Sequence, residues 1–224
     1  MQFKAGAIIT IGMLLATFSY YFYQLFFTAN LRVDKEDAYL YIPTGATFEI
    51  VTDSLNKYDV LNDKISFYFL SKLLKYREQI KPGKYLLQKN MSNWEAIKML
   101  KRGRQTPVKL TFNNVRLKTD LAEKVDAKLE LSASELNKSL SNEATAKNYG
   151  FTAETFMCMF IPNTYEMYWT ISTKDFLDKM HKEYQKFWNA ERTQKAKSIG
   201  MTPVEVIILA SIVEAETNKN DEKP

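Results

Sequence analysis

The sequence predicts an α+β protein that begins with a transmembrane helix and continues into a small α+β domain and then a mostly helical domain. Residues 5–27 carry no charged side chain and are long enough to cross a bilayer as a helix. Beyond them, strand patterns alternate with helical patterns to about residue 130, and helical patterns dominate from there on. We therefore expect a cytoplasmic tail at 1–4, a transmembrane helix at 5–27, an α+β domain at 31–130 and a helical domain at 131–224.

The apolar N-terminal segment is predicted to be an uncleaved, single-pass anchor. Only Lys4 and the terminal amine precede it, which favours a cytoplasmic N-terminus, and aromatic residues gather at its far end, where they suit the headgroup region. A cleaved signal peptide is the alternative, but the apolar run is longer than a usual signal core and no small-x-small site ends it. We expect a cell inner membrane protein with residues 31–224 on the periplasmic or extracytoplasmic side.

Three strand-and-helix units are predicted in the first domain. Ser92 and Glu95 form a capping box at the start of the second unit's helix. Three loosely matching units are too few for a solenoid, so a small α+β domain is the better interpretation. The predicted strands are 38–42, 84–88 and 108–112, and the helices are 47–58, 64–76, 92–102 and 118–129.

The second domain is predicted to contain helices at 134–140, 143–149 and 174–197, with an aromatic segment at 151–169. Within that segment Pro162 and Asn163-Thr164 favour a turn, which places Tyr165 and Glu166 next to a loop. Aromatic residues near a turn are typical of surfaces that stack on sugar rings, and they are equally typical of core packing.

A carboxylic acid in an apolar helix is the main functional lead. Thr202, Pro203 and Glu205 supply an N-cap, a proline at the first helical position and a capping box. The segment 204–213 is apolar apart from Glu205 and Ser211, so we expect little of this helix to face water. Burial would raise the pKa of Glu214 toward the range useful for a proton donor.

The helical period distinguishes this acid from its neighbours. At about 100° per residue, Glu214 shares a face with Ile207, Ala210 and Ser211, whereas Glu205 and Glu216 fall together on a different stripe. Two alternatives stay open from composition alone: Glu214 is exposed near a fraying helix end, or it pairs with a buried lysine.

A basic region follows the first helices. From Lys72 to Lys118 the sequence carries thirteen Lys and Arg residues against two acids, Glu78 and Glu95. This balance favours an anionic partner such as nucleic acid, lipid headgroups or an acidic cell-wall polymer, and a solvated face without a partner is the alternative. The membrane anchor argues against nucleic acid.

One cysteine and one histidine limit the chemistry. Cys158 lies in an apolar run, so no internal disulfide can form and we expect a buried thiol, while His181 is expected at a solvated helix position. No acids cluster at ligand spacing and no glycine-rich phosphate loop is present, so we predict no metal site and no cofactor.

Two motifs carry a resemblance to a known family: Leu209-Ala-Ser-Ile-Val-Glu-Ala-Glu-Thr217 and, before it, Ile161-Pro-Asn-Thr-Tyr-Glu166. They resemble the endolytic murein transglycosylase family, also called MltG or YceG-like, and the order of anchor, domain and motif is similar over essentially the whole chain. The resemblance implies that 31–130 is LysM-like and that 131–224 cleaves peptidoglycan glycan strands. Phe112-Asn-Asn-Val115 departs from the Pro-Glu-Gly turn of many relatives, and Asn163 replaces a frequent aspartate.

The resemblance also implies roles for individual residues. Glu214 maps onto the family's catalytic acid, which cuts the bond between N-acetylmuramic acid and N-acetylglucosamine and leaves a 1,6-anhydro end. Because the nucleophile is the substrate's own C6 hydroxyl, one carboxylic acid is enough, whereas ordinary glycosidases need two. Tyr165, Asn163, Glu166 and Ser211 are the expected substrate-binding or supporting residues, and peptidoglycan synthases are expected partners.

Relatives continue past the position of Pro224. We therefore expect 131–224 to be an incomplete catalytic domain, and this chain alone to be inactive or poorly folded. The rival hypothesis is a membrane-anchored envelope protein that binds peptidoglycan, or holds cell-wall synthases, without catalysis.

Overall fold

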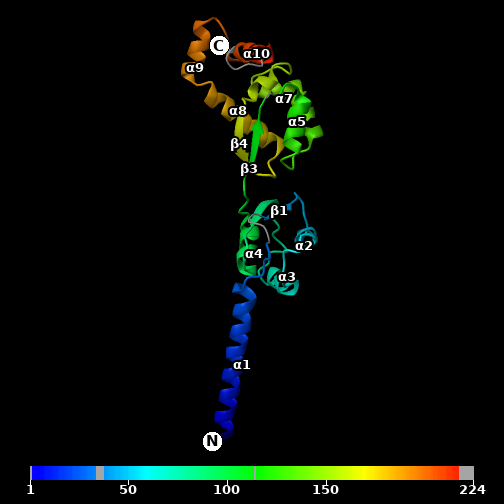
Figure 1. The fold of residues 1–224 in the computed structure, drawn as a ribbon, viewed down its shortest axis with the longest axis vertical. Coiled ribbons are helices and arrows are strands. Elements are labelled where there is room, and N and C mark those ends of the chain that lie inside the picture. The colour runs from blue at the N-terminus through cyan, green and yellow to red at the C-terminus, as the bar shows by residue number, and fades with distance from the viewer. Residues whose placement is uncertain (1, 34–37, 114, 217–224) are drawn as a thin grey trace. The chain divides into compact units, whose positions relative to one another are not determined.

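The computed structural model describes residues 2–33, 38–113 and 115–216, and the chain divides into two compact units (Figure 1). Unit 1 is Met1–Pro107 and unit 2 is Val108–Pro224. The mixture of helices and strands confirms the α+β class. The expected domain boundary at 130/131 is wrong, because the third strand of the sequence pairs with a strand of the second domain and so belongs to unit 2.

Unit 1 packs helices around a two-stranded antiparallel sheet. Leu40 lies opposite Tyr85 in this sheet, and both are buried. Thr47, Asp63 and Ser92 cap the three helices that follow, each accepting a hydrogen bond from a backbone N–H three residues on. The elements are α1 (Gln2–Phe27), β1 (Ala38–Ile42), α2 (Phe48–Lys57), α3 (Lys64–Leu73), β2 (Gly83–Leu87) and α4 (Asn93–Arg102).

The predicted capping box of α4 is present. The Glu95 carboxylate accepts hydrogen bonds from the backbone N–H and the hydroxyl of Ser92, both at 2.9 Å. These bonds, the backbone one first, lower the pKa of Glu95 below its ordinary value. The helix ends at Gly103, whose φ of 70° is the left-handed conformation that a glycine adopts without strain.

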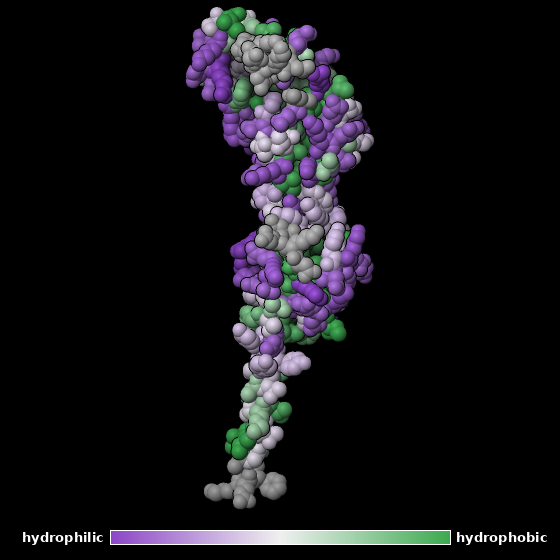
Figure 2. All heavy atoms as spheres, viewed as in Figure 1, coloured by the Kyte–Doolittle hydropathy of each residue, from purple (hydrophilic) through white to green (hydrophobic). Residues whose placement is uncertain are grey.

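Helix α1 is long and apolar enough to cross a membrane over Gly6–Phe27. The side chains of its middle turns are exposed. Figure 2 shows the helix as a mixture of pale residues, of intermediate hydropathy, and green, hydrophobic residues. In unit 2, α9 (Ala190–Ser198) and α10 (Pro203–Glu216) are long and apolar enough to cross a membrane only as a pair, and this pair is bent by 75°.

A buried polar cluster fastens the end of α1 to unit 1. The Asn93 side-chain amide donates to the backbone oxygen of Leu25 at 3.2 Å and to the Ser66 hydroxyl at 2.9 Å. The Asn30 amide donates to Asn93 Oδ1 at 2.7 Å and to the backbone oxygen of Asp63 at 2.9 Å. Three elements, α1, α3 and α4, therefore meet at Asn93, which is 2% exposed.

Unit 2 surrounds a second two-stranded antiparallel sheet with helices. The predicted turn at Asn163-Thr164 is wrong, because both residues belong to strand β4, which pairs with β3. The predicted single helix at 174–197 is also interrupted, since α8 ends at Phe187 and Asn189 caps α9 through the backbone N–H of Arg192. The elements are β3 (Val108–Phe112), α5 (Lys118–Asp126), α6 (Ala133–Leu140), α7 (Glu143–Asn148), η1 (Phe156–Met159), β4 (Asn163–Met167), α8 (Thr173–Phe187), α9 (Ala190–Ser198) and α10 (Pro203–Glu216).

Replacement of Asn93 by alanine should lower the free energy of unfolding of unit 1 by about 1 to 3 kcal/mol, because buried polar atoms of Asn30 and Ser66 lose their partner. Chemical denaturation of the full chain in detergent measures the change. Asn62→Ala is the matched control, since the Asn62 side chain is exposed. Equal stability of Asn93→Ala and wild type would contradict the role of this cluster.

Candidate functional site

A cleft of about 1270 Å³ lies within unit 2 between α9, α10 and the segment around η1. Its walls are largely apolar, with side chains from the ends of β3 and α8 and from the start of α5. The apolar lining includes Phe112, Leu121, Met157, Cys158, Phe160, Ile161, Pro162, Phe187, Trp188, Ile199, Val206, Ile207 and Ile208.

One face of α10 borders this cleft. Ile207, Ala210, Ser211 and Glu214 all line it, whereas Glu205 and Glu216 do not. The helical period predicted this grouping, and the cleft confirms it. The capping box that begins the helix is confirmed as well, because the Thr202 backbone N–H and hydroxyl both donate to the Glu205 carboxylate, at 2.7 and 2.9 Å.

The expected burial of α10 is wrong. None of its residues is buried, and Glu214 itself is exposed. The helix touches unit 2 mainly through α9 and η1, with Val204 and Ile207 packed against the core, so most of its apolar surface faces the cleft or solvent. The carboxyl group of Glu214 is therefore reached from the cleft rather than enclosed by the fold.

Three cations accompany Glu214 in the cleft: Arg116, Arg192 and Lys195. The Arg192 guanidinium lies over the Phe187 ring, 4.3 Å from its centroid, and donates to the Phe187 backbone oxygen at 2.8 Å. Lys195 contacts Glu191 at 2.8 Å in an exposed pair, which adds little stability. Among the described residues that line the cleft, one acid thus accompanies three cations.

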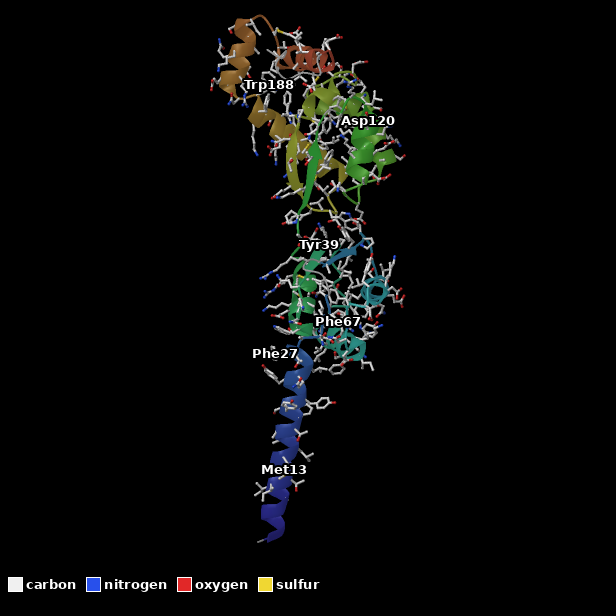
Figure 3. All side chains as sticks on the ribbon, viewed as in Figure 1. Met13, Phe27, Tyr39, Phe67, Asp120 and Trp188 are labelled. Atoms are coloured by element: carbon white, nitrogen blue, oxygen red, sulfur yellow. The ribbon has the colours of Figure 1, made fainter. Side chains whose placement is uncertain are left out.

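Trp188 contributes a polar atom that folding leaves unpaired. Its indole N–H is buried and has no hydrogen-bond partner among the described residues. The ring lines the cleft at the end of α8, where Figure 3 labels it. Sequence reasoning missed Trp188 and the three cations, although Arg192, Lys195 and Ile199 recur at helical spacing and all line the cleft.

The predicted substrate-binding residues are not brought together. Ser211 lines the cleft with Glu214, and its hydroxyl donates to the Ile208 backbone oxygen at 2.7 Å. Asn163 and Glu166 lie outside the cleft lining. Both are exposed on β4, where Glu166 faces Lys109 of β3 at 3.8 Å and Asn163 Oδ1 accepts from the Thr164 backbone N–H at 2.7 Å.

Tyr165 is a core residue of unit 2, which is the core-packing alternative left open for aromatic residues near the predicted turn. It is 5% exposed, its ring packs 5.6 Å from that of Phe112, and its hydroxyl donates to the Ile161 backbone oxygen at 2.6 Å. Burial, with a smaller contribution from the charge of Glu183, raises its pKa to about 12. Because Ile161 and Pro162 line the cleft, Tyr165 supports the wall from behind.

The single cysteine and the single histidine of the sequence both pack against other parts of unit 2. Cys158 is buried, as expected, and burial raises the pKa of its thiol. His181 lies beside the Tyr149 ring, 5.4 Å between centroids, on α8. Within the described ranges, no group of three or more His, Cys, Asp or Glu residues could hold a metal ion.

Comparison with known proteins places these features in a family. The family model described as YceG-like matches residues 40–224, which include both sequence motifs and the whole of unit 2. This chain belongs to the YceG-like family. A search of the curated proteins found no match.

A solved YceG-like structure is also similar to the chain. It is the 2.6 Å crystal structure of the yceG-like protein lmo1499 from Listeria monocytogenes, with a TM-score of 0.48 and 20% sequence identity. The similarity covers 84% of this chain and 66% of the Listeria chain. This YceG-like chain therefore spans just under two thirds of that relative.

Replacement of Tyr165 by phenylalanine should lower the stability of unit 2 by about 1 kcal/mol near neutral pH, because the bond to Ile161 is lost. The pKa of Tyr165 is about 12 in the folded state and about 10 when unfolded, so its protonated form stabilises the fold below pH 10. That stabilisation disappears as the pH rises through 12. The free energy of unfolding, measured between pH 8 and 12, should therefore fall less steeply with pH in Tyr165→Phe than in wild type.

Tyr168→Phe is the matched control, since Tyr168 is 55% exposed. If Tyr165→Phe and wild type lose stability equally over that pH range, the supporting role of the Tyr165 hydroxyl is refuted.

Proposed function

We propose that this YceG-like protein is a membrane-anchored endolytic lytic transglycosylase of peptidoglycan. The observation that carries the proposal is the position of Glu214, on the α10 face that borders the large cleft of unit 2. Family membership supports it, because the motif around Glu214 lies within the matched residues.

Glu214 would act in both steps of the reaction. As a neutral acid it protonates the oxygen between N-acetylmuramic acid and N-acetylglucosamine. As a carboxylate it then accepts the proton of the muramic C6 hydroxyl, which attacks the anomeric carbon and leaves a 1,6-anhydro end. Since Glu214 is exposed without substrate, a glycan seated in the cleft would supply the desolvation that favours its neutral form.

The cleft suits a polymer better than a small molecule. Its volume of about 1270 Å³ exceeds the ~300–1,000 Å³ typical of small-ligand pockets. Apolar and aromatic walls such as Trp188 favour the faces of sugar rings, and Ser211 adds a hydroxyl beside Glu214. Arg116, Arg192 and Lys195 suit the carboxylates of the stem peptides.

The apolar helix α1 supports the proposed location. A single pass of α1 through the inner membrane would place unit 1 and unit 2 on the periplasmic or extracytoplasmic side, where glycan strands and their synthases lie. Unit 1 in this proposal is the LysM-like region next to the membrane.

The second candidate function is an envelope protein that binds peptidoglycan, or holds its synthases, without catalysis. The exposure of Glu214 is the observation that favours it, because a general acid usually needs a desolvated site.

Glu214→Gln should lower the release of 1,6-anhydro products by about 10²- to 10⁴-fold, because glutamine can neither donate nor accept the proton. The assay incubates the protein, purified from its own membranes, with peptidoglycan and identifies the products by mass spectrometry. Glu216→Gln is the matched control and should keep full activity, since Glu216 does not line the cleft.

The same product profile from wild type and Glu214→Gln would mean that Glu214 is not catalytic. Activity lost only in Glu216→Gln would assign the role to the other acid. Peptidoglycan bound by wild type without any 1,6-anhydro product would favour the non-catalytic function.

A further inference from the structure

Unit 1 exposes an apolar ridge of three side chains on α3. Ile65, Phe69 and Leu73 are 82%, 54% and 52% exposed. Their spacing of four residues places them along one side of α3. Water solvates three adjacent large apolar side chains poorly, so an exposed ridge of this kind marks an interaction site.

The ridge is tied to the end of α1 by the buried cluster at Asn93. The Asn93 amide bonds both the Leu25 backbone oxygen of α1 and the Ser66 hydroxyl of α3, one residue after Ile65. Figure 1 shows α3 at the end of unit 1 where α1 joins it. If α1 spans the membrane, α3 is therefore held next to the point where the chain leaves it.

Aromatic side chains continue the surface from α1 onto α4. Phe27 is 52% exposed, and the Trp94 ring packs 6.5 Å from it and 6.1 Å from Phe26. Twenty helical residues from Gly6 cover the ~30 Å hydrocarbon core, which brings Phe26 and Phe27 to headgroup level. Aromatic rings are enriched at this depth.

A second cleft, of about 850 Å³, opens beside these rings and is rich in cations. Lys89, Lys98, Arg102 and Arg104 line it, and the Lys98 ammonium lies 5.4 Å from the centre of the Trp94 ring. Glu95 is the acid of this lining, and its carboxylate is engaged by Ser92 in the capping box. Lys98 and Arg102 of α4 line this cleft together with Phe27 of α1.

We propose that these groups form one membrane-binding surface, in which the α3 ridge enters the outer part of the bilayer and the α4 cations hold the phosphates of acidic phospholipids. The inference rests on the proposed anchoring by α1. The apolar ridge suits the hydrocarbon edge of a leaflet, the aromatic rings suit its interface, and the cations suit its phosphates. A soluble polyanion would match the cations but would leave the ridge without a partner. Unit 1 is thereby seated on the membrane rather than suspended above it.

The test places a fluorescent, environment-sensitive label at Phe69→Cys in a Cys158→Ala background. The full chain is reconstituted into phosphatidylcholine vesicles with and without phosphatidylglycerol. The label should emit at shorter wavelength and be quenched by brominated lipid about twofold more than a label at Tyr41→Cys on strand β1. The combined substitution Lys98→Gln, Arg102→Gln and Arg104→Gln should remove the dependence on phosphatidylglycerol.

Lys128→Gln, Lys138→Gln and Lys182→Gln together are the matched charge control, because these exposed lysines belong to unit 2. Equal quenching at positions 69 and 41 would overturn the proposal, as would an unchanged lipid dependence in the α4 triple variant. A label at Leu15→Cys reports the anchor separately. Quenching at 15 without quenching at 69 rejects the surface alone, whereas loss of both rejects the anchoring.

Discussion

The pairing of β3 with β4 is the contact on which the geometry of unit 2 depends. It joins strands more than fifty residues apart, with Leu110 opposite Tyr165 and a hydrogen bond of 2.9 Å between Thr111 and Thr164. Alternate residues of both strands point into the core, and the end of β3 and the segment before β4 supply part of the cleft wall. The helices between the strands, α5 to α7, are closed into a loop by this pairing.

Unit 1 also contains a two-stranded sheet, but it must in addition hold the end of the long helix α1. Its sheet, β1 with β2, is also two-stranded and antiparallel, yet its polar cluster at Asn30 and Asn93 joins a long exposed helix to a folded core. Two buried amides that satisfy each other and neighbouring backbone atoms define one orientation for the end of α1, because any other would leave polar groups unpaired. The direction in which the chain enters unit 1 is thus set by hydrogen bonds as well as by Phe26.

Features that depend on adjacent residues could be predicted from the sequence. The capping boxes at Ser92 and Thr202, and the face shared by Ser211 and Glu214, follow from helical spacing alone. Strand β4 could not be predicted, since Pro162-Asn163 is a local turn signal and the pairing that overrides it lies far away in the sequence. The prediction that α10 is buried was wrong for a related reason. An apolar composition shows that a helix can be buried, but it does not show which other elements pack against it.

The consequence for the candidate site is chemical. A carboxyl group enclosed by its own fold would be prepared as an acid before substrate arrives, whereas Glu214 lies open to the cleft. In the proposed reaction its neutral form must then depend on the occupant, because a sugar ring packed against apolar walls excludes water from the carboxyl. In the proposed reaction, Glu214 would then donate its proton only when a glycan occupies the cleft. The apolar lining of the cleft and the exposed carboxyl of Glu214 would therefore act together, because the lining holds the sugar ring that excludes water from the carboxyl.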